Sequence, residues 1–410
     1  MELTKNKFKR TEVGLIPEDW DCLRIGSFAN CTSGGTPSTQ NGKYWGGDIP
    51  WMNSGELNLK HVYDVENRIT EDGLNNSSTK YIPENSVLIG LAGQGKTRGT
   101  VAINHVRLCI NQSIASIFPS NKHNSHFLYF YLDSQYYELR KLSTGDGGRG
   151  GLNLGIIKSL FVPIATLTEQ KAIATALSDV DELIAKLEKL IEKKKAIKQG
   201  AMQALLTPKK DWTHAKIFEL GLDISDGNYS SKYPKSSEFK EIGIPFIRAN
   251  NIKDITILDS DMRYISSELH AELRKGHLKK GDILITTRGE IGQIAIVPDR
   301  FVNSNINAQI VRINTNDKIN NYFFAYSLMK SETQSTLLNL QTGSALKQLP
   351  VGKLNQVKIS FPRREEQDSI ANILKVIDSD IVSLDTKCQK YKNVKQGMMQ
   401  ELLTGRTRLV

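Results

Sequence analysis

The sequence predicts an α+β fold with two mixed α/β globular domains, separated by two long antiparallel coiled-coil helices and related by a pseudo-two-fold internal repeat. The first observation is a repeated segment, because residues 198–207 return almost unchanged as 395–404, an offset of 395 − 198 = 197 in a chain of 410. A repeat of half the chain length indicates two copies of one unit. The second observation is a long helical pattern before each copy, and the third is a set of short apolar runs between them.

These patterns divide the chain into four parts. We place the first globular domain, including the N-terminal segment, at 1–165 and the first helix at 166–208. The second globular domain covers 209–362 and the second helix 363–410. Each globular domain, of about 150 residues, is large enough for its own core. The helices resemble each other far more than the globular domains do, which favours a fixed frame that carries two domains with different targets.

The helices are predicted from an apolar seam with steps of 4, 3, 4, 3 and 4 residues in both copies. This spacing is typical of a coiled-coil heptad, so each helix needs a long partner, and the other copy supplies one within the same chain. A helix of about 40 residues is roughly 60 Å long, which suits a spacer. The seam residues are Ile173, Leu177, Val180, Ile184, Leu187 and Ile191 in the first copy, and Ile370, Leu374, Ile377, Ile381, Leu384 and Cys388 in the second.

Local signals predict the ends of the helices. Thr166 and Glu169 have the spacing of a capping box, and Pro208 follows the end of the first helix. Gly200 and Gly397 occupy matching interior positions, where each costs about 1 kcal/mol relative to Ala. We expect either a close helix crossing or a local break to compensate.

Strands and single helices are predicted within the globular domains. Residues 87–103 and 283–297 form apolar runs around glycine-containing turns, the pattern of a β-hairpin. Residues 126–142 and 321–340 each predict one amphipathic helix.

The first hairpin raises an alternative. Residues 90–97, Gly-Leu-Ala-Gly-Gln-Gly-Lys-Thr, match the P-loop pattern of nucleotide-binding proteins. That site needs a helix to begin at Lys96 and Thr97, whereas the next residues read as a turn into another strand, and the second copy lacks Gly-Lys-Thr. A glycine-rich hairpin is the better interpretation, and ATPase activity the weaker one.

Composition favours a polyanionic partner and excludes several classes. The formal net charge is +10, with a pI near 9.2, which attracts phosphate non-specifically. Four scattered cysteines and seven histidines form no metal-ligand pattern, so we expect no metal site and no disulfide framework. We find neither a signal peptide nor a stretch of 18 apolar residues, and therefore expect a cytoplasmic protein with no membrane partner.

Several features in a fixed order resemble the specificity subunit of type I DNA restriction-modification systems. They are the opening 14–20, the two hairpins, the Thr-Gly loops at 144–145 and 342–343, the Glu-Gln helix starts at 169–170 and 366–367, and the Leu-Leu-Thr helix ends. The resemblance covers essentially the whole chain. It implies two target-recognition domains that each read half of a split, asymmetric double-stranded DNA site, while the helices set the number of unread base pairs.

The resemblance also implies a division of labour. The subunit is non-catalytic and holds no cofactor of its own, and two methylation subunits dock on its helices and use S-adenosylmethionine. Such complexes occur with or without two motor-nuclease (restriction) subunits that use ATP. The sequence agrees, since it contains no Asn-Pro-Pro-aromatic or Asp-Pro-Pro-aromatic methyltransferase motif and no catalytic cluster. A scaffold whose globular domains bind no DNA is the second alternative.

Candidate DNA-binding side chains lie in the predicted loops. Arg and Lys can pair with guanine, and Gln and Asn with adenine, although solvated loop charges and phosphate contacts are the commoner outcome. Lysines on the first helix, 186–198, predict either solvated ion pairs or contacts with the spacer phosphates. The loop candidates are Gln94, Lys96, Arg98, Arg149 and Asn53 in the first domain, and Arg288, Gln293, Lys347 and Arg248 in the second.

Overall fold

The chain divides into two compact units. The computed structural model describes residues 7–93, 97–142, 151–227, 233–344 and 347–409. Unit 1 contains Met1–Glu188 and Thr386–Val410, and unit 2 contains Lys189–Asp385. Each unit therefore combines one globular region with the beginning of one long helix and the end of the other.

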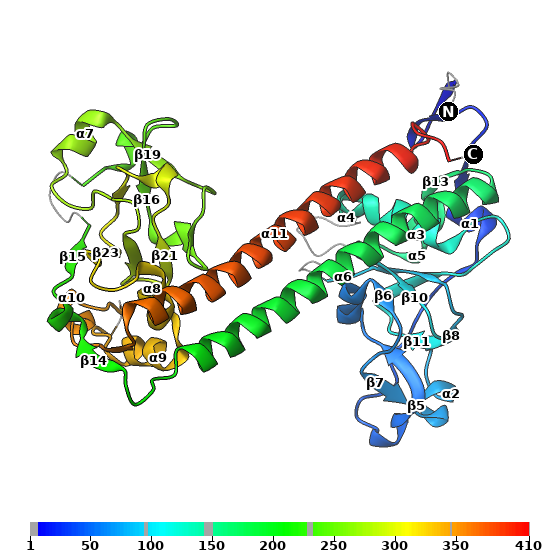
Figure 1. Cartoon of the computed structure of the whole chain (residues 1–410). Helices are drawn as coiled ribbons and strands as arrows, with labels where there is room; N and C mark the ends of the chain where they lie inside the picture. Colours follow the sequence, from blue (N-terminus) through cyan, green and yellow to red (C-terminus); the bar gives the residue numbers. More distant parts are fainter. Residues whose placement is uncertain (1–6, 94–96, 143–150, 228–232, 345–346, 410) are drawn as a thin grey trace. The chain divides into compact units, whose positions relative to one another are not determined.

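The two long helices have the same length and matching positions. α6 spans Leu167–Leu205 and α11 spans Arg364–Leu402, 39 residues each, and both ends are related by the 197-residue offset. At about 1.5 Å per residue, each is roughly 58 Å long. Within each unit the two helices run side by side in opposite chain directions, as Figure 1 shows in green and red. The predicted fold class, with its long antiparallel helices, is confirmed.

The expectation for the helix glycines is wrong. Gly200 and Gly397 are exposed and lie within unbroken α-helix. A Cβ atom added to either would meet nothing within 4 Å. Neither a close crossing inside the chain nor a local break explains them.

Unit 1 contains two mixed sheets and two small ribbons. The larger sheet has the strand order β4-β12-β9-β10-β6, and the second has the order β7-β5-β11-β8. The ribbons are β1-β2 and β13-β3. The strands are β1 (Phe8–Thr11), β2 (Gly14–Pro17), β3 (Asp21–Arg24), β4 (Cys31–Ser33), β5 (Trp45–Met52), β6 (His61–Val62), β7 (Asn67–Ile69), β8 (Tyr81–Ile82), β9 (Val87–Gly90), β10 (Val101–Asn104), β11 (Leu108–Ile110), β12 (Ile114–Ile117) and β13 (Phe161–Ile164).

Unit 2 repeats this plan with fewer strands. Its sheets have the orders β15-β23-β20-β21 and β19-β16-β22, and its ribbons are β14-β24 and β17-β18. In both units the second sheet contains one parallel pair, β11 on β5 and β22 on β16. The strands are β14 (Thr213–Lys216), β15 (Asp223–Asp226), β16 (Ile244–Ile247), β17 (Ile252–Lys253), β18 (Thr256–Ile257), β19 (Arg263–Ile265), β20 (Ile283–Thr286), β21 (Ile294–Ile296), β22 (Asn305–Ile306), β23 (Ile310–Asn314) and β24 (Lys358–Phe361).

Short helices complete each unit. In unit 1 they are α1 (Ile25–Phe28), α2 (Glu71–Asn75), α3 (Ser125–Ser134), α4 (Tyr136–Lys141) and α5 (Leu154–Ser159). In unit 2 they are α7 (Ser267–Glu272), α8 (Asn321–Met329), α9 (Ser331–Asn339) and α10 (Val351–Leu354).

The predicted single amphipathic helices are each two helices. The first is divided into α3 and α4 at Gln135, and the second into α8 and α9 at Lys330. Neither break has a proline or glycine to mark it. Both α3 and α8 bury six consecutive residues, Phe127–Leu132 and Phe323–Leu328, so they are core helices without a solvent-facing half.

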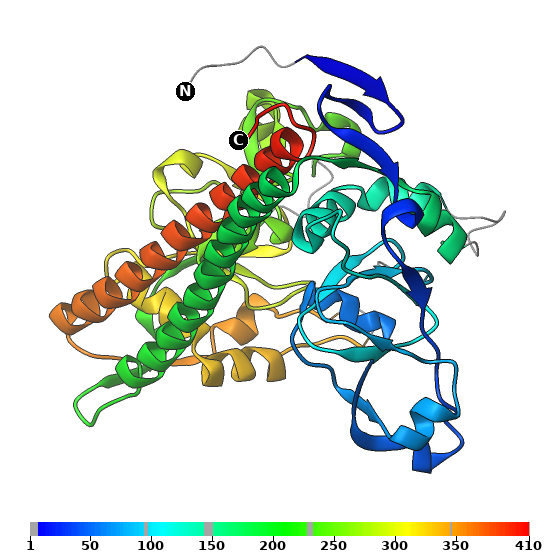
Figure 2. The ribbon, with the colours of Figure 1, turned by 90° about the vertical axis from the view of Figure 1, so that its right-hand side faces the viewer.

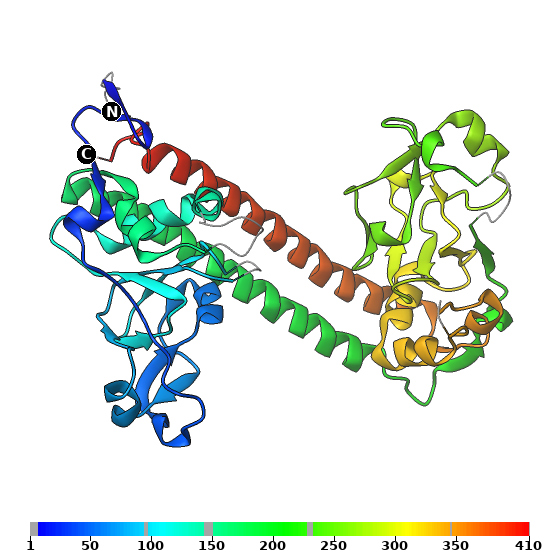
Figure 3. The same ribbon diagram turned by 180° about the vertical axis from the view of Figure 1, so that it is seen from behind.

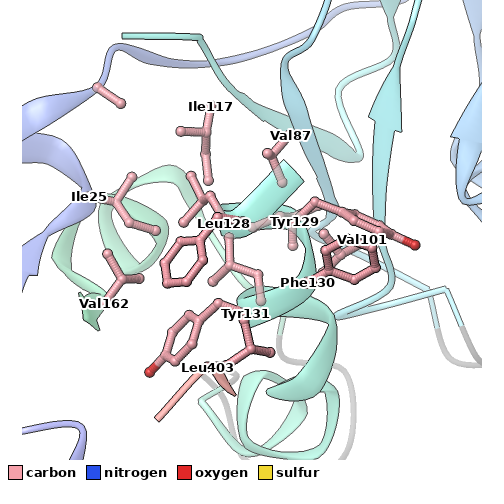
Figure 4. Close-up of a cluster of buried hydrophobic side chains, with 14 of the residues drawn as sticks. Ile25, Val87, Val101, Ile117, Leu128, Tyr129, Phe130, Tyr131, Val162 and Leu403 are labelled. Atoms are coloured by element: carbon pink, nitrogen blue, oxygen red, sulfur yellow. The ribbon is translucent and has the colours of Figure 1, made fainter. Parts of the chain in front are cut away.

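The core of unit 1 draws on distant parts of the chain. Figure 4 shows side chains of α3 surrounded by strand residues such as Val87 and Ile117, with Leu403 from the end of the chain beside them. The same cluster contains Ile173 and Leu177 from the first turns of α6. The core of unit 1 is thus closed by the end of α11.

The core of unit 2 is built in the same way with the helices exchanged. It contains Ile370 and Leu374 from the first turns of α11, and Leu206 from the residues that follow α6. Figure 3 shows the end of α6 and the beginning of α11 running beside the gold helices α8 and α9 within this unit. Each globular core therefore needs both long helices.

A buried glutamine fixes the beginning of each long helix. Gln170 accepts a hydrogen bond from the Asn124 backbone N–H (2.7 Å) and donates one to the Ala165 carbonyl (2.8 Å). Gln367 repeats the arrangement with Asn320 (2.9 Å) and Pro362 (2.9 Å). Asn124 and Asn320 also cap α3 and α8, so each glutamine couples a long helix to a core helix.

The predicted capping box is half wrong. Thr166 accepts a hydrogen bond from the Glu169 N–H at 3.3 Å, as expected. The Glu169 carboxylate does not return to the backbone of Thr166, because Trp20 Nε1 (3.0 Å) and Arg408 Nε (2.6 Å) bind it. Figure 2 shows the neighbourhood of this contact, where the N-terminal hairpin β1-β2 lies by the end of α11.

Candidate nucleic-acid interface

In each unit the structure brings the predicted hairpin loop next to the segment that follows the predicted Thr-Gly loop. In unit 1 the Leu152 N–H donates to the Leu91 carbonyl at 2.9 Å, and in unit 2 the Leu349 N–H donates to the Thr287 carbonyl at 2.9 Å. Leu152 and Leu349 are related by the 197-residue offset. Among the described residues, we call each combination a paired loop: residues 91–93 and 97–100 with 151–152 in unit 1, and 287–293 with 341–344 and 347–349 in unit 2.

Three unit 2 candidates lie in its paired loop. Arg288 pairs with Gln348 in a β-bridge, and Lys347 is the exposed neighbour of Gln348. Gln293 is half-buried, and its Nε2 donates to Glu290 Oε1 at 2.9 Å. A side chain of α9 stabilises the turn, because Gln334 Nε2 donates to the Gly292 carbonyl at 3.0 Å. The paired loop of unit 2 therefore combines a guanidinium and an amide from the hairpin turn with an ammonium from the segment that pairs with it.

Of the unit 1 candidates at the hairpin turn and in the segment 145–151, namely Gln94, Lys96, Arg98 and Arg149, only Arg98 lies within the described residues. Arg98 is half-buried, and its carbonyl accepts a hydrogen bond from Arg140 Nη1 at 3.2 Å. Arg140 thus supports this turn as Gln334 supports the other. The predictions for Gln94, Lys96 and Arg149 concern residues outside those that the structure describes.

The remaining two candidates form hydrogen bonds within the protein. Asn53 caps a short helix, with its Oδ1 accepting from the Gly55 N–H at 2.8 Å. Arg248 Nη2 donates to Asp261 Oδ2 at 2.7 Å, and this guanidinium holds the pKa of Asp261 below its usual value. Both are half-buried. A contact with DNA would compete with these internal bonds.

The seam residues divide between two environments. Ile173, Leu177, Ile370 and Leu374 belong to the globular cores described above. Val180, Ile377 and Leu384 are half-buried. Those that are buried outside the two cores are Ile184, Leu187, Ile191, Ile381 and Cys388. At the beginning of each long helix the seam therefore packs into a globular core, and further along it packs between the two long helices.

The helix lysines also divide. Lys198 and Lys194 bind Asp378 (2.6 Å) and Asp380 (2.7 Å) on α11, and Lys186 binds Glu182 (2.6 Å) one turn earlier on α6. Lys189 and Lys193 are exposed. The ion-pair interpretation holds for the first group, and contacts with the spacer phosphates remain a prediction for the second.

The same domain type matches the chain twice. The family model of the type I restriction modification DNA specificity domain covers residues 17–199 and 210–395, so each copy includes a globular region, its paired loop and most of a long helix. The chain belongs to this family. It is therefore a non-catalytic DNA specificity subunit of the type I restriction-modification kind.

Relatives over the full length support the assignment. The specificity subunit of the type I restriction enzyme MjaIX from Methanocaldococcus jannaschii is 24% identical, over 99% of this chain and 97% of that protein. The EcoBI specificity subunit of Escherichia coli is 25% identical, over 95% and 86%. The crystal structure of a type I system S subunit from M. genitalium has the same fold, with a TM-score of 0.62, 17% identity and 98% of both chains covered.

The alternative functions lose their support in this specificity subunit. The described residues after Lys96, Thr97–Thr100, form a turn and β10 begins at Val101, where a P-loop would need a helix. The two DNA specificity domains likewise remove the basis for a scaffold without DNA binding. Among the described residues, none of the helices combines the length and apolarity that crossing a membrane requires.

A histidine cluster in unit 1 was not predicted from sequence. His61 and His105 lie with Nδ1 and Nε2 3.0 Å apart, and His126 and Tyr63 lie against them. Over the part of the chain that the structure describes, no group of three His, Cys, Asp or Glu side chains is arranged to hold a metal ion. Burial lowers the pKa of His105 to about 4 and lowers the pKa of His61 and His126.

We expect this cluster to make unit 1 acid-sensitive. The unfolded chain binds protons at the ordinary histidine pKa near 6.5, whereas the folded cluster does not, so stability is lost as the pH falls from about 6.5 towards 4. Hydrogen exchange of core peptides at pH 7.5 and 5.5, corrected for intrinsic rates, should show greater loss of protection in unit 1 than in unit 2. His105→Phe keeps the ring and should reduce the difference. Equal losses in both units would contradict this role for the cluster.

Proposed function

We propose that each globular domain reads one half of a bipartite, asymmetric double-stranded DNA site through its paired loop. The observation that carries this proposal is the hydrogen bond that joins a hairpin loop to the segment after a Thr-Gly loop, at equivalent positions of two domains whose loop sequences differ. A common frame with different side chains suits two readers of different half-sites. Domain boundaries of 1–165, 166–208, 209–362 and 363–410 belong to the same proposal.

The paired loops offer the chemistry of base recognition. Arg and Lys can donate to guanine O6 and N7, and Gln can pair with adenine N6 and N7. We assign this role to Arg288, Gln293 and Lys347 in unit 2, and to Arg98 with Gln94, Lys96 and Arg149 in unit 1. Asn53 and Arg248 are proposed as weaker contributors, because neither lies in a paired loop.

Arg288→Ala should relax the sequence requirement at one position of one half-site. Loss of a bidentate contact with guanine costs about 1–3 kcal/mol in discrimination. The measurement is binding of the assembled complex to a set of duplexes with every single-base change in both half-sites. Arg98→Ala is the matched variant, and it should affect the other half-site only. Unchanged binding to all duplexes would remove that arginine from the reading surface.

We further propose that the helices dock two methylation subunits. The repeated residues Gln199, Gly200 and Gln203 are exposed on α6, and Gln396, Gly397 and Gln400 are exposed on α11. Packing within the chain does not explain why these surface residues recur. Gln199 and Gln203 also line a groove of about 320 Å³ beside Met329. The methylation subunits would bind S-adenosylmethionine, and restriction subunits, where a host has them, would bind ATP. This chain would then need no cofactor of its own. We place the complex in the cytoplasm.

Gly200→Arg and Gly397→Arg should each remove one methylation subunit, and the double variant should remove both. Each side chain would project from an exposed helix face into the docking surface. Native mass spectrometry of the co-expressed complex measures the stoichiometry. Ala at the same positions is the control, because it should stabilise each helix by about 1 kcal/mol without filling the surface. Full occupancy in the double Arg variant would place the docking surface elsewhere.

A further inference from the structure

The seam contains charged residues at two matching positions. Continuing its steps of 3 and 4 residues beyond Ile191 and Cys388 leads to Lys198 and Lys395. These lysines stand where a coiled coil would carry another apolar residue. A single polar residue at such a position lowers stability but selects one register.

Each lysine is paired with an aspartate of the opposite helix. Lys198 Nζ lies 2.6 Å from Asp378 Oδ1, with side chains 13% and 17% exposed. Lys395 Nζ lies 2.6 Å from Asp181 Oδ1, with side chains 18% and 23% exposed. Both members of one pair are offset by 197 residues from the members of the other. The residue numbers of the two pairs also have the same sum, which is the condition for one shared antiparallel register.

A ring from the globular core completes each arrangement. Lys198 Nζ lies 5.7 Å from the centroid of Tyr326 on α8, and Lys395 Nζ lies 5.3 Å from that of Phe130 on α3. Tyr326 also donates its hydroxyl proton to Asp378 Oδ2 at 2.5 Å. Each pair, which we call a lysine–aspartate lock, therefore joins α6, α11 and the core helix of its unit.

An apolar seam alone does not select one register of two paired helices. Shifting one helix by seven residues restores apolar contacts along the part of the seam outside the two cores, whereas it separates both lysines from their aspartates and leaves four poorly hydrated charges unpaired. Such a shift moves the helices by about 10 Å, the rise of three base pairs of B-DNA. The more exposed pair Lys194–Asp380 has no equivalent in the other copy, where Tyr391 and Leu183 stand.

We propose that the two lysine–aspartate locks are positioning elements that select one register of the helix pair and thereby fix the number of unread base pairs between the half-sites. This inference rests on the proposed reading of a bipartite site. The locks contribute to gap length and not to the choice of bases, because none of their four charged residues lies in a paired loop.

The test removes the charges and keeps the packing. The quadruple variant Lys198→Met, Asp378→Asn, Lys395→Met and Asp181→Asn, assembled with its methylation subunits, is assayed on duplexes whose gap is native or altered by one to three base pairs. We expect the half-sites to remain and the preference for the native gap to fall by about tenfold, the factor that corresponds to 1.4 kcal/mol. An unchanged gap preference would overturn the proposal.

A charge reversal provides the second variant. Lys198→Asp alone places two carboxylates together and should weaken the gap preference, whereas adding Asp378→Lys should restore it. A uniform loss of binding at all gaps in the single variant, or no recovery in the double variant, would reduce the lock to a purely structural contact and overturn the proposal. Failure of the wild-type complex to prefer any gap would instead refute the proposed reading of a bipartite site.

Discussion

Replacing Arg408 with Ala is expected to destabilise unit 1 by about 3–5 kcal/mol, because it leaves a buried carboxylate without its cation. The Glu169 side chain is 1% exposed and accepts hydrogen bonds from Arg408 Nε (2.6 Å) and Nη2 (2.9 Å). Arg408 also donates two bonds to Asp19, at 2.9 and 2.7 Å, which hold the pKa of Asp19 below its usual value. One guanidinium thus joins the end of the chain, the beginning of α6 and the N-terminal segment.

Hydrogen exchange measured by mass spectrometry can locate this loss. Peptides from β1, β2 and the first turns of α6 should lose protection in the variant, and peptides of unit 2 should not. Arg406→Ala is the control in the same tail, since Arg406 lies 3.9 Å from Glu401 and both side chains are largely exposed. Its expected effect is below about 0.5 kcal/mol. If the two variants behave alike, the buried contact with Glu169 does not stabilise unit 1.

Substituting the buried glutamines should damage the two units separately. Gln170→Leu removes the partners of the Asn124 N–H and the Ala165 carbonyl, and Gln367→Leu does the same to Asn320 and Pro362. Each unsatisfied buried group costs about 1–3 kcal/mol, so each variant should lose about 2–6 kcal/mol.

Unfolding followed by hydrogen exchange separates the two glutamine variants. Gln170→Leu should expose the amides of α3 and spare those of α8, and Gln367→Leu should do the reverse. Gln389→Leu is the surface control, because Gln389 is exposed on α11 and its Nε2 donates to Asn393 Oδ1 at 3.0 Å on the same helix. A similar loss in all three variants would show that the glutamines are not specific anchors.

The long helices and the repeat could be predicted because their signals are local and periodic. The seam spacing and the 197-residue offset located both helices and their relation. The break between α3 and α4 could not be predicted, because Gln135 carries no helix-breaking chemistry. The fate of Glu169 could not be predicted either, since its partner Arg408 lies 239 residues away in sequence.

The loops of the candidate interface could also be predicted from local signals, but the internal bonds of their side chains could not. Glycine-containing turns between apolar runs indicated the loops, and the hydrogen bonds of Leu152 and Leu349 bring the two loops of each unit together. The bond between Arg248 and Asp261 could not be predicted, because that contact depends on how two neighbouring loops fold. The locks do have a signal in the sequence, namely the continuation of the seam to Lys198 and Lys395.

Each core contains the beginning of one long helix and the end of the other, and this arrangement sets the order in which the two cores are completed during translation. Unit 2 is a continuous stretch, Lys189–Asp385, so all of its core residues have been synthesised before α11 is finished. Unit 1 needs Leu402 and Leu403, which are synthesised after every core residue of unit 2. The domain that is translated first is therefore completed second, and its apolar surface stays incomplete until α11 has been made.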